Sequence, residues 1–333
     1  MAVILYALHG RGRGHASRSL PVVRQLRANG WEVVVQGGGD ALDLAAPSDG
    51  LVPADPVRPG VFMPFDTGRR LWSDHQRLLA ADLVISDGDL PTALAAKRRG
   101  TPCLLVGHDL VFSRCRLPPG MPRWALVKQR LNAWHGEPLW RTPAIAVHFL
   151  PILPRTPDTR VARPATPSWP DDPAPTPSHR LVAYTRDGDG AELLRAAAER
   201  GWPIDWFGPG ARAMPGVVPH PFARESFMRH LRSASGVIGS AGSNLLAECV
   251  FAGCPVFAVH DERDAEQALN ARLVTETRVG VGCRRGAAQR HLDTWLARVS
   301  AGDFARVDLP AALPWVGDAV VAHVAAVLGP TTP

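Results

Sequence analysis

The segment from Gly239 to Asn270 combines residue types that suit a nucleotide diphosphate. A small, flexible turn comes first, and it leads into a helix whose single acid, Glu248, has apolar neighbours. Glycine lets backbone N–H groups approach a ligand closely, and a helix N-terminus favours negative charge. A carboxylate one turn into the helix can accept hydrogen bonds from ribose hydroxyls, and a later polar cluster can hold a sugar. The turn comprises Ser240, Ala241, Gly242, Ser243 and Asn244, and the later cluster begins with Glu266 and Gln267.

His15 is the candidate for proton transfer. It opens a helix after a glycine-rich turn that contains Gly12 and Gly14, and the helix dipole disfavours an imidazolium there. A neutral ring accepts a proton, which suits a general base worth about 10²–10⁴ in rate. The alternative is a histidine that caps the turn or binds phosphate. Arg18 shares the helix face of His15 and is either a phosphate ligand or a surface arginine.

Composition indicates a globular protein of two domains. The chain has 333 residues, of which 46% are hydrophobic, and it is long for a protein with a single hydrophobic core. No apolar run reaches the ~18–20 residues that span a bilayer. The first residues suit a strand rather than a signal peptide. Five cysteines without a CxxC pair suggest a reduced, cytoplasmic protein without structural zinc. The net charge of +6 suits anionic substrates, a membrane surface or nucleic acid alike.

Apolar runs alternate with helical segments in both halves of the chain. Strands buried on both faces and joined by helices predict parallel sheets. We therefore expect an α/β protein with two doubly wound, Rossmann-like domains that face a cleft, where ligands bind at the carboxyl ends of the strands. The predicted strands are 2–8, 32–36, 82–86, 101–107, 181–185, 204–207, 236–238 and 256–259, and the main predicted helices are 15–29, 91–99, 191–200 and 315–328.

A proline-rich segment divides the two halves. Nine of the 27 residues from 151 to 177 are proline, which excludes a helix or a central strand there. We expect a first domain at 1–150, a linker at 151–178 and a second domain at 179–312. The last residues, 313–333, are expected to form a helix that packs back toward the first domain.

These motifs resemble those of the GT-B glycosyltransferases that use nucleotide sugars, especially the group of UDP-glycosyltransferases and the lipid-linked peptidoglycan GlcNAc-transferase. Residues 12–18 match the family's Gly-x-Gly-His turn. Residues 239–270 match its donor pattern of a glycine-rich turn, Glu, Gly-x-Pro, and an acid-Gln pair with Asn three residues on. The chain has Ser240-Ala241-Gly242 where the family often has His-Gly-Gly, and Glu266-Gln267 in place of Asp-Gln. These departures bear on which sugar or nucleotide is held.

The resemblance implies a reaction and roles for particular residues. It implies an inverting, hexosyltransferase-type transfer from a nucleotide diphosphate sugar to an acceptor hydroxyl, with UDP as the expected nucleotide, the donor in 179–312 and the acceptor in 1–150. Asp87 would orient His15, with Asp89 as a competitor and a turn-forming aspartate as the alternative interpretation. Glu248 would bind the ribose, Glu266 and Gln267 the sugar hydroxyls, and Asn270 would support the loop.

Further residues have weaker signals. Arg186 follows a predicted strand and would contact the diphosphate, and Phe222 would lie near the nucleobase of the donor. His108 follows the strand 101–107 and either contacts the acceptor, replaces His15 as the base, or is a satisfied loop histidine. No metal ion or other cofactor is expected to be obligatory, and the nucleotide sugar is a co-substrate. The acids at 87–89 and 187–189 resemble an Asp-x-Asp metal motif, but the fold that uses it would leave 239–270 unexplained.

The acceptor is open between several classes. Basic and aromatic residues interleave from Phe112 to Arg141, which suits a lipid-linked or glycan acceptor at an anionic membrane, a modified DNA base, or only a basic surface over a tryptophan-containing core. The expected location is accordingly the cytoplasm or its membrane surface. The alternative functions are a nucleotide-sugar epimerase or hydrolase of the same fold, and a non-catalytic nucleotide-sugar-binding or DNA-binding protein.

Overall fold

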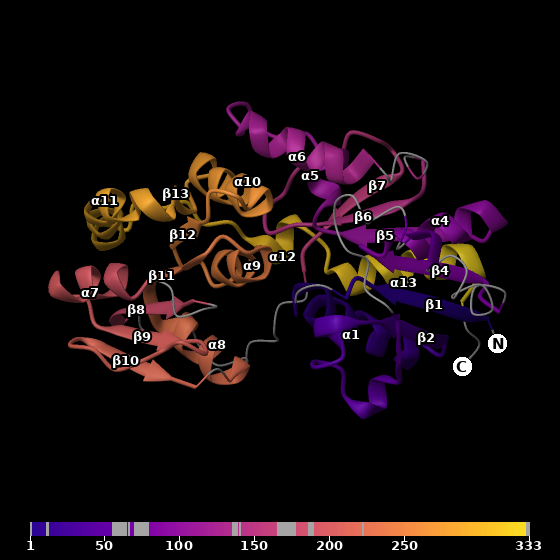
Figure 1. Ribbon diagram of the computed structural model, residues 1–333, viewed down its shortest axis with the longest axis horizontal. Helices are drawn as coiled ribbons and strands as arrows, with labels where there is room; N and C mark the ends of the chain where they lie inside the picture. Colours follow the sequence, from indigo (N-terminus) through magenta and orange to yellow (C-terminus); the bar gives the residue numbers. More distant parts are fainter. Residues whose placement is uncertain are drawn as a thin grey trace. The chain divides into compact units, whose positions relative to one another are not determined.

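The chain forms two α/β units, each built on a parallel sheet (Figure 1). This confirms the predicted fold class. The first unit comprises Met1–Leu117, Lys128–Ala165 and Leu313–Pro333, and the second comprises Pro118–Val127 and Thr166–Ala312. The computed structural model describes residues 2–10, 13–54, 65, 67–69, 80–134, 139, 141–164, 178–185, 190–221 and 223–330.

The sheet of the first unit has the order β3-β2-β1-β4-β5-β6-β7. Its central strands β1 and β4 are apolar and buried on both faces, as parallel strands covered by helices must be. The strand order reverses between these two strands, and ligands bind at such switch points in open α/β sheets. The strands are β1 (Val3–Leu8), β2 (Glu32–Gly37), β3 (Leu51–Pro53), β4 (Leu83–Asp87), β5 (Cys103–Gly107), β6 (Ala144–Val147) and β7 (Thr159–Ala162).

Strand β7 lies inside the range that was expected to be linker. It pairs with β6 alone and forms an edge of the sheet. An edge strand needs hydrogen bonds on one side only, so proline-rich flanks are compatible with it. The first unit therefore extends past residue 150.

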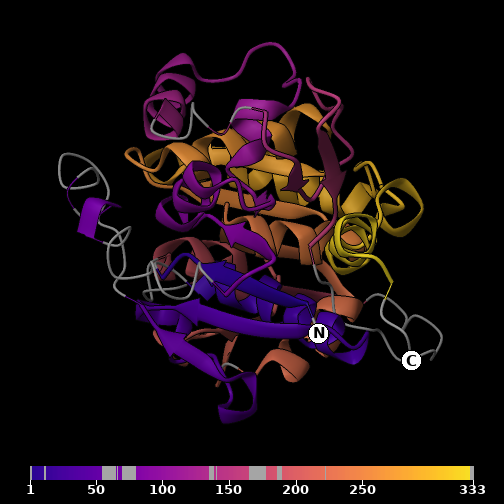
Figure 2. The same cartoon turned by 90° about the vertical axis from the view of Figure 1, so that its right-hand side faces the viewer.

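Helices α1 (Arg13–Ala28) and α13 (Val316–Leu328) pack on each other within the first unit, as Figures 1 and 2 show. Val23 of α1 and Val320 of α13 belong to one buried core together with the apolar residues of β1 and β4. The last helix is thus part of the first unit's interior. The other described helices of this unit are α4 (Leu90–Arg99) and α5 (Leu110–Arg114), with short 3-10 turns at η1 (Gly39–Ala41) and η2 (Pro47–Asp49). Helix α6 (Arg123–Trp134) is divided between the units, since residues 123–127 belong to the second unit and the rest to the first.

The second unit has a six-stranded parallel sheet of order β10-β9-β8-β11-β12-β13. Trp206, Phe257 and Trp295 are fully buried in its core. The order reverses between β8 and β11, so the turn that follows β11 lies at this unit's switch point. The strands are β8 (Ser178–Tyr184), β9 (Ile204–Phe207), β10 (Val217–His220), β11 (Ala234–Ser240), β12 (Val256–His260) and β13 (Gly280–Arg284). The helices are α7 (Ala191–Glu199), α8 (Arg224–Ser233), α9 (Ser243–Phe251), α10 (Ala265–Glu276), α11 (Ala288–Ala301) and α12 (Leu309–Ala312), with a 3-10 turn η5 (Arg285–Ala287).

In the described part of the chain, each helix is too short or too polar to cross a bilayer.

Candidate functional site

Asp87, at the end of β4, is the fully buried centre of a charged network in the first unit. Its Oδ2 accepts hydrogen bonds from Arg18 Nε at 2.9 Å and from the Ser19 hydroxyl, and its Oδ1 lies beside Arg18 Nη2 and 2.8 Å from His15 Nδ1. Burial would raise the pKa of Asp87, but the opposing charges of Arg18 and His15 hold it well below its ordinary value. The acid is therefore an ionised carboxylate that orients two side chains of α1.

The ring of His15 has one nitrogen turned to Asp87 and one available for chemistry. Arg18 Nη2 also lies 2.7 Å from His15 Nδ1, but arginine only donates, so this contact and a bond from Nδ1–H to Asp87 cannot both exist. A buried carboxylate would be repelled by a ring lone pair, so we assign the proton to Nδ1. Nε2 then carries the lone pair, and the side chain is 23% exposed.

Gly88 lets the backbone after β4 approach this ring closely. Its φ is +70°, and a Cβ there would lie 2.8 Å from His15 Cε1. His9 packs edge-on against His15, with ring centroids 5.2 Å apart. Burial, with a smaller contribution from His15, lowers the pKa of His9 to about 4. His9 is thus neutral and places no second cation beside the candidate base.

Sequence reasoning missed two members of this network, Ser19 and Tyr6. The Tyr6 hydroxyl donates to Ser19 Oγ at 3.2 Å, and burial raises the pKa of Tyr6 above its ordinary value. Ser19 lies four residues after His15 and Arg18 three, so one face of α1 carries all three side chains. That spacing is the signal that could have identified Ser19.

The other residues predicted for the first unit have varied surroundings. Gly14 accepts a hydrogen bond from Ser17 Oγ at 3.1 Å, whereas Gly12 lies outside the described residues. Asp89 caps α4 by accepting from Thr92 N at 3.1 Å. His108 is buried and donates from Nδ1 to the Val147 carbonyl at 2.9 Å, so its contacts are those of a satisfied histidine.

Arg114 lies within the basic and aromatic segment from Phe112 to Arg141 but is not part of a basic surface. The side chain is buried and donates to the carbonyls of Leu139 and Thr142 at 2.5 and 2.6 Å. Arg114 therefore holds the backbone at Leu139 and Thr142 against α5 within the first unit.

Hydrogen bonds to its backbone fix the turn after β11. The N-terminus of α9, which follows this turn, has no side-chain cap. Ala241 donates from its N–H to the Val259 carbonyl, and its own carbonyl accepts from Asn270 Nδ2, both at 3.0 Å. Asn270 is buried and thus has the supporting position expected of it. The N-cap residue Gly242 offers no side chain to the first N–H groups of α9. The positive end of the α9 dipole therefore lies at this turn, where an anion would be stabilised.

The acid expected to bind ribose, Glu248, is buried on α9 and has a cationic partner. Arg224, the first residue of α8, places Nη2 2.9 Å from Glu248 Oε1. Burial raises the pKa of Glu248, and the ion pair opposes this only in part. Nothing in the local sequence pattern indicated Arg224, because the contact depends on how α8 and α9 pack.

Comparisons with known proteins agree with these two units. Residues 179–300 match the family model described as glycosyl transferase family 1. The solved structure of MurG from Acinetobacter baumannii superposes with a TM-score of 0.67 at 16% identity, over 98% of this chain and 100% of that one. The fold is that of the GT-B glycosyltransferases.

Two further solved structures share this GT-B fold. CalG4, the calicheamicin glycosyltransferase, gives a TM-score of 0.64 at 19% identity over 100% of both chains. SsfS6 of Streptomyces sp. SF2575, complexed with thymidine diphosphate, gives 0.63 at 18% identity over 98% of this chain and 100% of that one. No match was found among the curated proteins.

The last donor-site candidates of the GT-B fold lie at the start of α10. Glu266 and Gln267 are half-buried residues of its first turn. Asp264, which the sequence analysis did not single out, caps this helix by accepting from Gln267 N at 3.0 Å. Arg186 and Phe222 lie outside the described residues. In the second unit, the turn after β11 thus leads into α9, which carries Glu248. Asn270 connects α10 to the same turn.

Proposed function

We propose that the protein is an inverting glycosyltransferase that moves a hexose from a nucleotide diphosphate sugar to an acceptor hydroxyl. The observation that carries this proposal is His15, whose Nδ1 is held by an ionised Asp87 and whose Nε2 remains available. In the second unit, the N-terminus of α9 would bind the diphosphate of the donor, and the buried Glu248 would bind its ribose. The GT-B fold and the family model over residues 179–300 support the same reaction class.

The chemistry follows from these positions. His15 Nε2 takes the acceptor's hydroxyl proton as the oxygen attacks the anomeric carbon. The bond from that carbon to the diphosphate breaks, and the leaving diphosphate takes the electron pair. Asp87 stabilises the imidazolium that forms, by the logic of a His–Asp pair. A single displacement from the opposite face inverts the anomeric centre.

The donor is held by the second unit. Backbone N–H groups at the start of α9 stabilise the departing diphosphate without an obligatory metal ion, which is a preorganised electrostatic effect. Glu248 accepts hydrogen bonds from the ribose, and Glu266 and Gln267 contact the sugar. We assign a UDP-linked donor, and thymidine diphosphate sugars are the first competitors to test because SsfS6 is complexed with that nucleotide.

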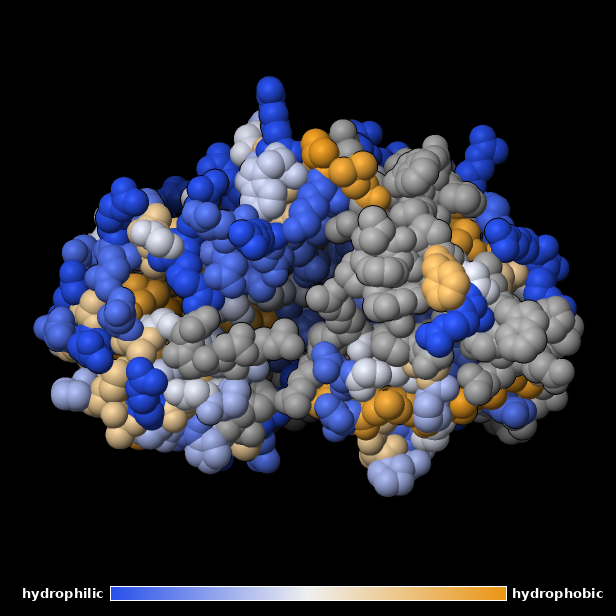
Figure 3. Space-filling model, in the orientation of Figure 1, coloured by the Kyte–Doolittle hydropathy of each residue, from blue (hydrophilic) through white to orange (hydrophobic). Residues whose placement is uncertain are grey.

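The acceptor class is suggested by one exposed face of α6. Trp124, Val127 and Leu131 are 38%, 54% and 66% exposed at helical spacing, and orange surface lies over α6 in Figure 3. Lys128 and Arg123 are on the same helix. An apolar stripe with cationic neighbours suits an anionic membrane, so we propose a lipid-linked acceptor and a peripheral position on the cytoplasmic membrane surface. A modified DNA base is the competing acceptor.

The test is the substitution His15→Ala, with His291→Ala, at an exposed histidine of α11, as a matched control. We expect turnover to fall about 10²-fold or more, while nucleotide binding by calorimetry changes little. The control should retain full turnover. Unchanged turnover in His15→Ala would remove His15 from the mechanism, and nucleotide release without any acceptor would instead indicate a hydrolase or epimerase.

A further inference from the structure

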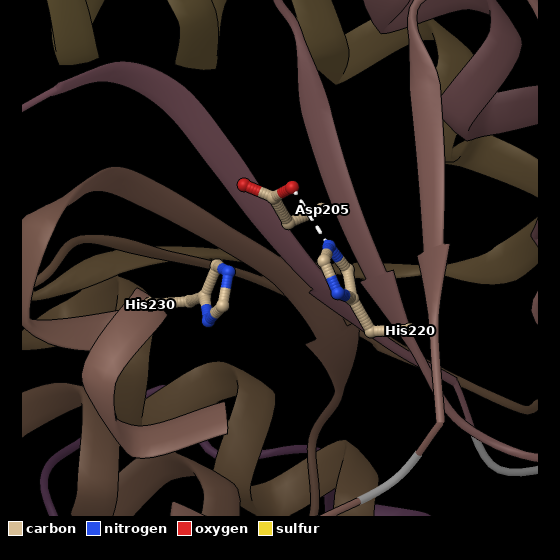
Figure 4. Close-up of side chains that lie close together, drawn as sticks. All are labelled: Asp205, His220 and His230. Carbon is tan, nitrogen blue, oxygen red and sulfur yellow. Dashed lines mark hydrogen bonds and ion pairs between the residues drawn. The ribbon is translucent and has the colours of Figure 1, made fainter. Parts of the chain in front are cut away.

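Two histidines and an acid from three elements of the second unit lie together (Figure 4). Asp205 comes from β9, His220 from the end of β10 and His230 from α8, and one candidate ligand atom of each lies within 4.8 Å of the others. No motif in the sequence indicated these three residues. The proposed transfer reaction does not use them either, so their arrangement needs a separate explanation.

Each histidine has one ring nitrogen oriented by an acceptor. His220 donates from Nε2 to Asp205 Oδ1 at 2.9 Å, and His230 donates from Nδ1 to the Ser226 carbonyl at 2.7 Å. The lone pairs therefore reside on Nδ1 of His220 and Nε2 of His230. Histidines that bind metal ions almost always have this second hydrogen bond to a carboxylate or a backbone carbonyl. Figure 4 shows the two rings side by side near Asp205, with their planes tilted by 55°.

Aromatic packing holds both rings in place. Phe207 stacks on His220 with ring centroids 4.8 Å apart and planes 14° apart, and it meets His230 edge-on at 5.2 Å. The two histidine rings are themselves 4.8 Å apart, centroid to centroid. Both are only partly buried, so water has access to complete a coordination shell. The pair is therefore oriented before any ligand arrives.

The charge around the pair limits its affinity for a cation. Arg180 donates from Nε and Nη2 to the two oxygens of Asp205, both at 2.7 Å. Burial would raise the pKa of Asp205, but the hydrogen bonds from Arg180 and His220 outweigh burial and lower it. Asp205 is thus an ionised carboxylate whose charge Arg180 balances. The Arg180 guanidinium would repel a divalent cation bound at the two histidines.

We infer that Nδ1 of His220 and Nε2 of His230 bind a divalent transition-metal ion, with Asp205 orienting His220 and water completing the coordination. Imidazole ligands suit zinc, copper and nickel ions. The ion would clip α8 to the edge of the sheet. Since α8 begins with Arg224, which pairs with Glu248, the clip also steadies the partner of the proposed ribose ligand.

The experiment is calorimetric titration of the untagged full-length chain with nickel chloride, together with thermal unfolding in nickel and in EDTA. We expect one ion per chain and a higher Tm with nickel, since a ligand bound only by the folded state stabilises it. His230→Ala should abolish both effects, and His291→Ala, at an exposed histidine of α11, should retain them. His220→Ala repeats the test from β10, and a variant counts only when its Tm in EDTA shows that it is folded.

Two neighbouring substitutions separate this geometry from adventitious surface binding. Asp205→Asn should weaken nickel binding by ~10–100-fold through the loss of an orienting partner. Arg180→Gln should strengthen it by removing the nearby positive charge. Equal nickel affinity in the wild type and in His230→Ala, or no binding to the wild type at millimolar nickel, would overturn the inference. No transfer assay is involved, so this outcome is independent of the proposed function.

Discussion

The two units of the chain share one sheet plan but use their polar side chains in opposite ways. In the first unit Asp87 has contacts to Arg18, Ser19 and His15, so the network is closed among protein groups. In the second unit the N-terminus of α9 has no side-chain cap, and Glu248 pairs with an arginine that is 48% exposed. We propose that the closed network orients His15 as a base, and that the open N-terminus of α9 receives the charge of an anionic ligand.

Asp87→Ala breaks the closed network and should have the largest effect on stability. The substitution leaves the guanidinium of Arg18, which is 5% exposed, buried without its carboxylate. Removing one partner of a buried pair costs about 3–5 kcal/mol, to be measured by denaturant unfolding. Turnover should fall as well, because His15 loses the group that orients it.

Asp49→Ala is the matched control for this loss. Asp49 is also buried, and Arg24 holds it with two hydrogen bonds of 2.9 Å, but Arg24 is 56% exposed and water can solvate it after the change. The free energy of unfolding should therefore fall by less than in Asp87→Ala. Equal losses in the two variants would mean that burial of the arginine is irrelevant.

Asn270→Ala tests the open site by releasing its backbone turn. The buried Ala241 carbonyl would lose its side-chain donor, which costs about 1–3 kcal/mol of unfolding free energy. Nucleotide binding should weaken because α9 is no longer held in place. Asn29→Ala is the control, since this exposed side chain also donates to a carbonyl, that of Gln25 at 2.8 Å, and its loss should stay within ~0.5 kcal/mol.

The pH dependence of stability should differ in sign between the two acids. The pKa of Asp87 is lowered on folding, so its stabilisation is present above the ordinary value of 3.8 and is lost as the pH falls through the folded-state pKa. The pKa of Glu248 is raised from 4.5, so its contribution is present below that value and is lost as the pH rises through the folded-state pKa.

Glu248→Gln isolates the second of these contributions. The stability of the variant relative to the wild type should improve as the pH rises above about 4.5, measured by urea unfolding across a pH series. The lost ion pair with Arg224 should cost only about 0–1 kcal/mol because that arginine is half exposed. A stability difference that does not change with pH would show that folding leaves the pKa of Glu248 unchanged.

The sequence predicted those parts of the fold that have strong local signals. Strand β9 has the predicted bounds 204–207, and β12 and α13 differ from prediction by one residue at one end. The pairing of His15 with Asp87 was implied by the resemblance to the GT-B glycosyltransferases, and the sheet explains it. His15 comes after the turn that follows β1, Asp87 ends β4, and these two strands are parallel neighbours whose carboxyl ends coincide.

Contacts that depend on packing had no such signal. Arg224 reaches Glu248 from another helix, and the cluster of Asp205, His220 and His230 joins three elements without a metal-ligand spacing. Arg114 carried the signal of a surface cation, yet backbone carbonyls of its own unit satisfy it inside. Periodicity and turn residues describe one element at a time, so partners chosen by tertiary packing remain invisible to them.

The return of α13 to the first unit sets an order for biosynthesis. Residues of β1 leave the ribosome before the second unit, yet Val316, Val320 and Val324, which belong to the same hydrophobic core, are translated after that unit. Domains usually acquire structure from the N-terminus onward during synthesis. Here the core of the first unit cannot be completed until the second unit has emerged and α13 has followed it.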